Sequence, residues 1–474
     1  MDMSNTSSSV SGDPSELETL RSENAMLRDE VAFLRKEIGR LQAKLDRITG
    51  GGNVPDPSIA RTNPLKKQKE RKERKKRTQN FVRKKDPATR EVSLFAQKCP
   101  DCGRRLEGGW EHGRRQVIDI PAIPVEVTDY IITARHCGAC DKRVLPDRNF
   151  QGIVVGKHRI GIRLMSIITH LREAAHMPVR TIQETLKSLF GLSISVGEIV
   201  VLAQDFARIG KPVYDALREE IRGSDYCHSD ETSWREDGVG GELWSVSTPN
   251  VSFFHRDTRE ARVIEEILGD YQGTVVSDFY AGYNHVGRRH QRCWRHYLAD
   301  LHSLKEACPD NPALVKWVDD IVALYRDAKK YQQVCRQAIA SGRPLFGYMV
   351  FDRRRTREVF ENELLEIARQ PVPDAPDRHT TLAQRIENFL SELFTFTLYP
   401  DVPSDNNAAE REIRPAVINR KVCGGTRSKK GSLTKMINMS LLRTWRKRSI
   451  PTIEQGIRML AEYKTPASIR APTI

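Results

Sequence analysis

Three acidic residues have types and positions that suit phosphoryl-transfer chemistry. Asp230 ends one strand-like run of residues and Asp278 ends another. Glu410 follows Asp405 and Asn406, either of which would cap a helix, so Glu410 would lie in the first turn of that helix. If the two strands are neighbours, both aspartates meet at one edge of a sheet. The ordinary alternative is that the aspartates are turn residues and Glu410 is a solvated helix residue.

Carboxylates that meet at one place repel each other strongly, and bound cations relieve that repulsion. Two Mg²⁺ ions about 3.5–4 Å apart are the usual solution, and such a pair activates a water or a 3′-hydroxyl for in-line attack on a phosphate. The pattern therefore predicts two catalytic magnesium ions bound by Asp230, Asp278 and Glu410.

Four cysteines form a second candidate metal site. They occur as two Cys-x-x-Cys pairs, Cys99 with Cys102 and Cys137 with Cys140. Two thiolates at this spacing can bind a tetrahedral Zn²⁺ from one tight turn, and a second such turn completes the coordination. A closed set of four cysteines leaves no position for a substrate, so we expect one structural zinc in a zinc ribbon. The redox alternative lacks the βαβ context of a thioredoxin-like motif.

The elements that must position the three acids follow the order β-β-β-α-β. Strands are expected at 226–230, 242–247, 251–255 and 273–278, and a helix at 259–268. Between the second and third acids, residues 299–369 have mostly helical spacing, which indicates an inserted helical subdomain. In the cysteine region, short strands are expected at 116–121 and 125–132.

A helical segment precedes these strands. Residues 181–190 and 195–207 predict two helices joined by a turn at Gly191, and Ser195 with Glu198 fits a capping box. The pair is either a helix-turn-helix whose second helix enters a DNA groove or an ordinary helical hairpin. Both interpretations stay open.

The first part of the chain predicts a coiled coil. The a positions are Leu17, Asn24, Val31, Ile38 and Leu45, and the d positions are Leu20, Leu27, Leu34, Leu41 and Ile48. A single Asn at an a position fixes register and favours a parallel dimer. We therefore expect a homodimer or higher oligomer through this zipper; the alternative is a lone amphipathic helix packed on its own protein.

A strongly basic segment follows the zipper. Residues 61–85 hold thirteen Lys and Arg against two Glu, while the chain of 474 residues has a net charge of +15. Such runs bind the phosphate backbone of nucleic acids without reading sequence, or serve as solvated linkers. The expected DNA-binding residues here are Lys66, Lys67, Arg71, Lys72, Arg74, Lys75, Lys76, Arg77, Arg83, Lys84 and Lys85.

The composition also bears on the cellular compartment. No stretch approaches the roughly 18–20 uninterrupted apolar residues of a membrane span, and the polar start lacks the apolar region of a signal peptide. Nine cysteines, an odd number, do not fit a secreted disulfide framework. We expect a cytoplasmic protein with no membrane partner.

Four strings resemble the signature blocks of DDE transposases of the insertion sequence 66 family. They are HSDETSW, VVSDFYAGYNH, CWRHYLADL and DNNAAEREIRPAVINRK, and the resemblance covers nearly the whole chain. By motif, Asp230, Asp278 and Glu410 match the catalytic triad. The resemblance also implies DNA contacts at the basic residues that flank the third acid, Arg414, Arg420 and Lys421. Cys293 and His296 match a Cys-x-x-His element of several DDE families, to which no metal is assigned.

The resemblance implies a multidomain α+β architecture with a ribonuclease-H-like α/β catalytic core. The expected segments are a leucine-zipper coiled coil at 15–49, a basic flexible linker at 50–92, a zinc ribbon at 93–150, a helical, helix-turn-helix-like DNA-binding segment at 151–222, the first part of the core at 223–296, a helical insertion at 297–400, and the second part of the core with a C-terminal segment at 401–474.

The implied function is that of a DNA transposase, which catalyses metal-dependent strand cleavage and strand transfer of an insertion sequence. Its partners would be the element ends, target DNA and other element-encoded proteins. Two alternatives remain at this point. One is a non-enzymatic regulator that binds DNA through its zipper and zinc ribbon, and the other is a metal-dependent nuclease.

Overall fold

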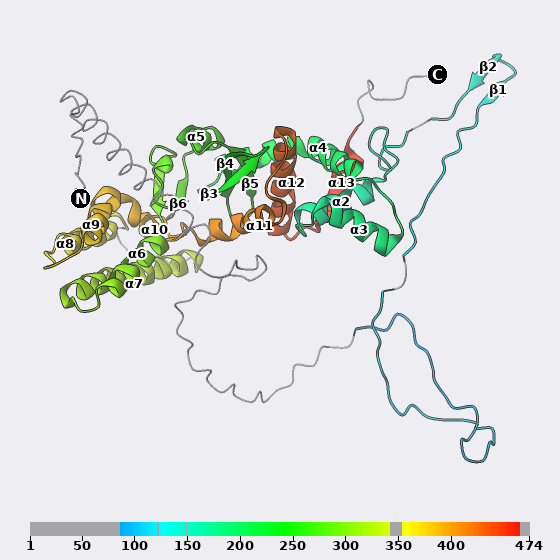
Figure 1. Cartoon of the computed structure of the whole chain (residues 1–474), viewed down its shortest axis with the longest axis horizontal. Helices are drawn as coiled ribbons and strands as arrows, with labels where there is room; N and C mark the ends of the chain where they lie inside the picture. Colours follow the sequence, from blue (N-terminus) through cyan, green and yellow to red (C-terminus); the bar gives the residue numbers. More distant parts are fainter. Residues whose placement is uncertain (1–85, 121–122, 148, 342–352, 465–474) are drawn as a thin grey trace, which may run out of the picture. The chain divides into compact units, whose positions relative to one another are not determined.

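The structure, a computed structural model, describes residues 86–120, 123–147, 149–341 and 353–464. The predicted zipper at 15–49 and the basic residues from Lys66 to Lys85 lie outside these ranges. The chain divides into two compact units, Met1–Ile118 and Asp119–Ile474. The second unit contains all of the helices and strands labelled in Figure 1.

A mixed five-stranded sheet forms the centre of the second unit (Figure 1). Its strands are β3 (Tyr226–Glu236), β4 (Val239–Ser247), β5 (Ser252–Asp257), β6 (Thr274–Ser277) and β7 (Arg289–Arg292), in the order β5-β4-β3-β6-β7. Strands β3, β4 and β5 are antiparallel neighbours, whereas β6 and β7 run parallel to β3. The sheet confirms the expected neighbourhood of the first and fourth strands.

One detail of the predicted strands is wrong, because Asp230 does not end its strand. β3 continues to Glu236, since the residues after Asp230 pair with β4 as far as Glu236 opposite Val239. The parallel pairing with β6 stops earlier, at His228. Asp230 therefore lies just beyond the point where β3 and β6 part.

Strand β7 was not predicted, because its sequence Arg-His-Gln-Arg has no apolar alternation. It is nevertheless buried, and the side chain of its Gln291 is paired with the chain around residues 393–396. The Gln291 amide donates to the Leu393 carbonyl at 3.0 Å, and its oxygen accepts the Phe396 N–H at 2.8 Å. Buried polar groups that are paired in this way cost little stability.

Helices cover both faces of the sheet. Trp244 joins a core with α4 (Val196–Arg222) and α5 (Ala261–Leu268). Its neighbour Leu243 joins a different core with α11 (Asn407–Cys423) and α12 (Lys429–Lys447). Because successive strand residues point to opposite faces, the two cores lie on opposite sides of the sheet.

The helical segment before the sheet consists of α2 (Ile162–Glu173), α3 (Val179–Phe190) and α4, with α13 (Thr452–Glu462) packed against α2. The expected capping at Ser195 is confirmed, since its hydroxyl accepts the Glu198 N–H at 3.1 Å. Helix α4 is much longer than the predicted 195–207 because its apolar residues stay in the core as far as Ile221. Its role in DNA binding stays a prediction.

A third hydrophobic core is formed by the helices between β7 and α11 in the sequence. Its helices are α6 (Trp294–Ala307), α7 (Pro312–Ala340), α8 (Arg353–Ala368), α9 (Asp377–Leu393) and α10 (Thr395–Leu398), which Figure 1 shows gathered together. Trp294 and Trp317 are fully buried within this core. The helical spacing read from residues 299–369 is thus confirmed for the described residues.

The cysteine region contains the hairpin β1 (Arg135–Cys137) and β2 (Lys142–Val144). The strands expected at 116–121 and 125–132 do not form among the described residues. These residues alternate like a strand but lack a packing partner; Ile131, for example, is 88% exposed. An unpartnered apolar alternation does not make a strand, because pairing and burial stabilise sheets.

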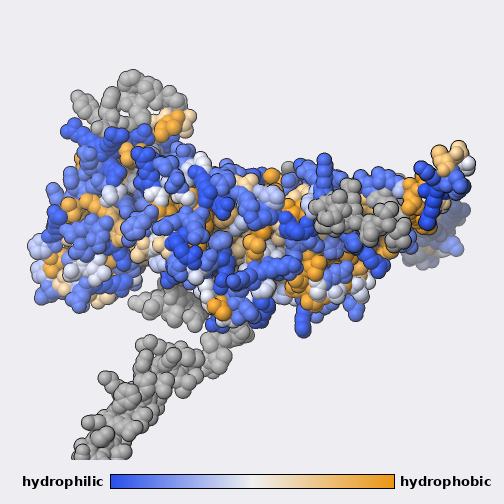
Figure 2. All heavy atoms as spheres, turned by 90° about the horizontal axis from the view of Figure 1, so that it is seen from above, coloured by the Kyte–Doolittle hydropathy of each residue, from blue (hydrophilic) through white to orange (hydrophobic). Residues whose placement is uncertain are grey.

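Hydrophilic residues predominate on the face shown in Figure 2, with hydrophobic residues scattered among them. Of the helices in the described ranges, none is both long and apolar enough to cross a bilayer.

Candidate active site

Asp230 and Asp278 come from the neighbouring parallel strands β3 and β6. His228 is opposite Val276, so extending this register by two residues brings Asp230 level with Asp278. Asp278 directly follows β6, and its carboxylate accepts the Tyr280 N–H at 2.9 Å. The two aspartates therefore lie at the same end of neighbouring parallel strands, just beyond the residues that pair.

Glu410 lies in the first turn of α11, as predicted. The start of that helix is fastened to β3 by Asn406, which is 1% exposed. The Asn406 Nδ2 donates to the Ser229 carbonyl at 2.7 Å, and its Oδ1 lies 2.8 Å from His228 Nδ1. Of the two expected caps, Asp405 accepts a backbone N–H at the helix start at 3.1 Å, whereas Asn406 uses its side chain to hold β3.

The three predicted acids share one electrostatic environment. Burial raises the pKa of Asp230 to about 7, and the negative charges of Glu231, Asp278 and Glu410 add to this effect. A carboxylate surrounded in this way needs a proton or a cation as counter-charge. In residues 86–120, 123–147, 149–341 and 353–464, however, no three His, Cys, Asp or Glu side chains lie close enough together to hold a metal ion.

The fourth acid of this group, Glu231, is engaged by other side chains. Its carboxylate accepts the Tyr283 hydroxyl at 2.7 Å and pairs with Arg259 at 3.0 Å. Arg259 in turn stacks over the Tyr280 ring at 4.4 Å. These partners engage the Glu231 carboxylate, although its charge still contributes to the raised pKa of Asp230.

A pocket opens beside Glu410. Its volume is about 610 Å³, and it is lined by residues of α6, α7 and the start of α11: Arg295, His296, Leu298, Ala299, His302, Tyr325, Asp405, Asn407 and Glu410. The His296 Nε2 lies 3.6 Å from the Glu410 Oε1, and both side chains are nearly half exposed. The third acid is therefore accessible from solvent through this pocket.

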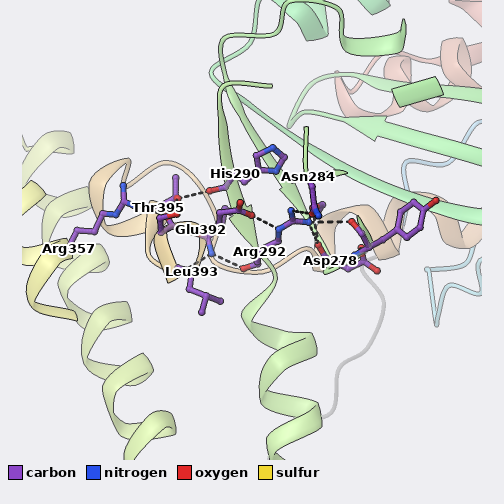
Figure 3. A network of polar contacts seen from close by, with 12 residues as sticks. Asp278, Asn284, His290, Arg292, Arg357, Glu392, Leu393 and Thr395 are labelled. Carbon is purple, nitrogen blue, oxygen red and sulfur yellow. Dashed lines mark hydrogen bonds and ion pairs between the residues drawn. The ribbon is translucent and has the colours of Figure 1, made fainter. Parts of the chain in front are cut away.

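A buried arginine organises the backbone that carries Asp278 (Figure 3). Arg292 donates to the Asp278 carbonyl at 2.9 Å and to the Asn284 side chain at 2.7 Å, and it pairs with Glu392 at 2.5 Å. Its side chain is fully buried, so its charge depends on these partners. Arg292 thereby connects the loop after β6 to α9.

Sequence reasoning missed Arg292, Cys293 and Asn406 as structural members of the site. All three lie in or next to the motif strings. The sequence predicts no role for Arg292 and no metal at Cys293, and it predicts Asn406 only as a possible helix cap. Their contacts join residues far apart in the chain, such as Asn406 with Ser229. The spacing of residues in the sequence does not predict such contacts.

Each cysteine pair forms a tight turn. Within the first, the Gly103 N–H donates to the Cys99 carbonyl at 2.9 Å. Hydrogen bonds from the backbone of the residues that follow lower the pKa of Cys99 and of Cys137, which favours the thiolate that zinc requires. Because the two pairs belong to different units, their joint zinc site stays a prediction.

The basic residues predicted beside the third acid differ in their surroundings. Arg414 and Lys421 are exposed on α11. Arg420 instead donates to the Thr232 hydroxyl at 3.1 Å and to Ser233, so it also fastens α11 to β3. Arg414 and Lys421 thus remain the freer candidates for DNA contact in this helix.

Comparison with known proteins identifies relatives over most of the described chain. A family model described as the transposase IS66 family matches residues 157–433. The uncharacterized protein y4jO of Sinorhizobium fredii is 29% identical over 182 residues, which are 38% of this chain and 50% of that protein. The uncharacterized protein y4jD of the same organism is 22% identical over 357 residues, 69% of this chain and 66% of that protein. The chain thus spans between half and two thirds of these relatives.

Proposed function

Because the chain belongs to the transposase IS66 family, we propose that it is a DDE-type transposase that cleaves a DNA strand at an element end and joins the freed 3′-hydroxyl to target DNA. Asp230, Asp278 and Glu410 would be the catalytic acids. The mixed sheet, in which antiparallel β3–β5 are followed by parallel β6 and β7, supports a ribonuclease-H-like core for this reaction.

The observation that carries the proposal is the position of Asp230 and Asp278 at the same end of the neighbouring parallel strands β3 and β6. Burial, together with the charges of Glu231, Asp278 and Glu410, raises the pKa of Asp230 to about 7. A buried carboxyl group such as Asp230, whose ionisation is opposed by neighbouring acids, suits a hard divalent cation as counter-charge, because Mg²⁺ prefers oxygen ligands. When bound there, two Mg²⁺ would supply Lewis acidity and favour ionisation of the attacking hydroxyl.

The residues of the chain itself would orient this donor set. The Tyr280 N–H holds one oxygen of Asp278, and the Arg292 guanidinium holds its carbonyl. Asn406 fixes the start of α11 one turn before Glu410. Donors fixed in this way lose little orientation entropy when substrate binds.

Basic residues, the predicted zipper and the four cysteines would provide further contacts to DNA, to a second chain and to zinc. We propose that Arg414, Lys421 and the basic run from Lys66 to Lys85 contact DNA phosphates, and that the zipper at 15–49 makes the chain a dimer or higher oligomer. Cys99, Cys102, Cys137 and Cys140 would hold one structural zinc.

A strand-transfer assay tests the proposed activity. Asp230→Asn, Asp278→Asn and Glu410→Gln should each abolish cleavage and joining while DNA binding survives, since losses at such sites amount to several kcal/mol of barrier and about 1.4 kcal/mol is tenfold in rate. Two exposed acids of the same unit, Glu265 and Asp270, supply the matched controls Glu265→Gln and Asp270→Asn.

The controls should keep full activity. Near-normal joining by any of the three acid variants would refute its assignment. Cleavage by the unaltered protein without joining would instead favour a nuclease, and DNA binding without either reaction would favour a regulator.

A further inference from the structure

We propose that Cys293 and Asn406 form a latch that sets the spacing of Asp230, Asp278 and Glu410, which makes both of them positioning residues of the site. This inference rests on the proposed function, because it concerns how the three acids are held for their joint role.

Asn406 is hydrogen-bonded to the residue before the first acid and to the backbone of the third acid itself. Its Nδ2 donates at 2.7 Å to the carbonyl of Ser229, the residue before Asp230. Its own carbonyl accepts the Glu410 N–H at 3.3 Å. A single buried residue therefore links the middle of β3, through its side chain, to the first turn of α11, through its backbone carbonyl.

Cys293 extends this link to the second acid. The Asn406 N–H donates to the Cys293 Sγ at 3.1 Å. The Cys293 N–H donates at 2.9 Å to the carbonyl of Ser277, the residue before Asp278. Through hydrogen bonds of these two residues, the latch thus reaches the residue before Asp230, the residue before Asp278 and the backbone of Glu410.

Burial makes the latch stiff. Asn406 is 1% exposed and Cys293 is 0% exposed. The remaining acceptor of the Asn406 amide, Oδ1, is paired with His228 Nδ1 at 2.8 Å, and His228 is itself buried. Breaking one of these bonds would leave a buried polar group unpaired, which is unfavourable. The geometry therefore resists displacement of α11 relative to β3 and β6.

The Cys-x-x-His element gains a role from this arrangement. Its cysteine contacts Asn406, and its histidine lies beside Glu410 in the pocket. The element acts on protein groups that surround the acids, and its cysteine is used as a hydrogen-bond acceptor. Groups that orient metal ligands from outside typically change metal affinity by about 10–100-fold when they are removed.

The test is Mn²⁺ binding to the full chain, measured by electron paramagnetic resonance of the free ion, together with the melting temperature. Asn406→Ala should raise the Kd for Mn²⁺ by about tenfold. Cys293→Ala should also raise it, and Cys293→Ser should restore most of the affinity because a hydroxyl oxygen can accept the Asn406 N–H. If Asn406→Ala does not fold, the comparison of Cys293→Ala with Cys293→Ser tests the latch.

The matched control is Asn438, another buried asparagine, whose Nδ2 donates to the Ala203 carbonyl at 3.0 Å and so joins α12 to α4. Asn438→Ala should lower the melting temperature but leave the Kd for Mn²⁺ unchanged. The latch is refuted if Asn406→Ala and Cys293→Ala bind Mn²⁺ like the unaltered protein, or if Asn438→Ala weakens binding equally.

Asp230→Asn distinguishes failure of the proposed catalytic site from failure of the latch alone. If it binds Mn²⁺ like the unaltered protein, the proposed catalytic site itself fails. If it loses binding while Asn406→Ala keeps it, the catalytic site stands and only the latch fails.

Discussion

Replacing Asp230 by Asn should stabilise the metal-free protein at alkaline pH. The folded pKa of Asp230 is about 7, against an ordinary value of 3.8. For a carboxyl group whose pKa is raised by folding, the folded state binds more protons, so stability is greatest below the unfolded pKa and falls as pH rises through the folded pKa. The destabilisation from this group therefore develops between about pH 4 and pH 7 and is complete above that window.

The size of the expected stabilisation follows from the pKa shift of Asp230. One pKa unit corresponds to about 1.4 kcal/mol, so the full shift sets an upper limit of about 4 kcal/mol. Since Asn still buries a polar amide, we expect a gain of about 2 kcal/mol at pH 8 and almost none at pH 4. For a unit of this size, about 2 kcal/mol corresponds to a rise of about 3 °C in melting temperature.

The assay is a series of melting curves from pH 4 to pH 8 in the presence of a chelator. Asp270→Asn, at an exposed position after α5, is the control and should follow the unaltered protein at every pH. Addition of Mg²⁺ should stabilise the unaltered protein more than Asp230→Asn, because ligand binding to the folded state stabilises it. A difference between Asp230→Asn and the unaltered protein that is independent of pH would refute the reasoning.

Three further changes have defined outcomes. Glu412 is a buried acid that pairs with Arg443 at 2.8 Å and with Lys447 at 3.2 Å. Its carboxylate also accepts the Ser252 hydroxyl. Although burial opposes ionisation of Glu412, these positive charges lower its pKa. Glu412→Gln should therefore lower the unfolding free energy by about 3 kcal/mol at neutral pH, seen as a reduced melting temperature, and an unchanged melting temperature would contradict the pairing. Cys102→Ser should remove zinc from the purified full chain, because structural zinc is bound only by the complete ligand set; elemental analysis that finds no zinc in the unaltered protein would refute the site. Asn24→Leu should tighten association of a 1–60 peptide and loosen its stoichiometry, whereas a 1–60 peptide that is monomeric at tens of micromolar would argue against the zipper.

Sequence patterns were informative where one local rule decides the structure. Alternation located the strands that carry Asp230 and Asp278, and the capping box at Ser195 located the start of α4. Asp278 ends its strand as expected, while Asp230 does not, because β4 pairs with β3 well past it. A strand end depends on the partner strand as much as on its own residues.

Tertiary pairs account for what the sequence could not predict. Strand β7 is polar, and it is stabilised by Gln291 bonding to the backbone near residue 393. Asn406 has the type and position of a cap, yet its side chain bonds to Ser229. Both cases depend on contacts across more than a hundred residues, for which a single sequence carries no periodic signal.

Anomalous diffraction from crystals of the full chain soaked in Mn²⁺ is the most direct test of whether Asp230, Asp278 and Glu410 bind metal ions together. We expect two Mn²⁺ peaks about 3.5–4 Å apart, ligated by Asp230, Asp278 and Glu410, and loss of at least one peak in Glu410→Gln. Mn²⁺ bound elsewhere, or a well-ordered site in which these three carboxylates bind no ion at saturating Mn²⁺, would contradict it.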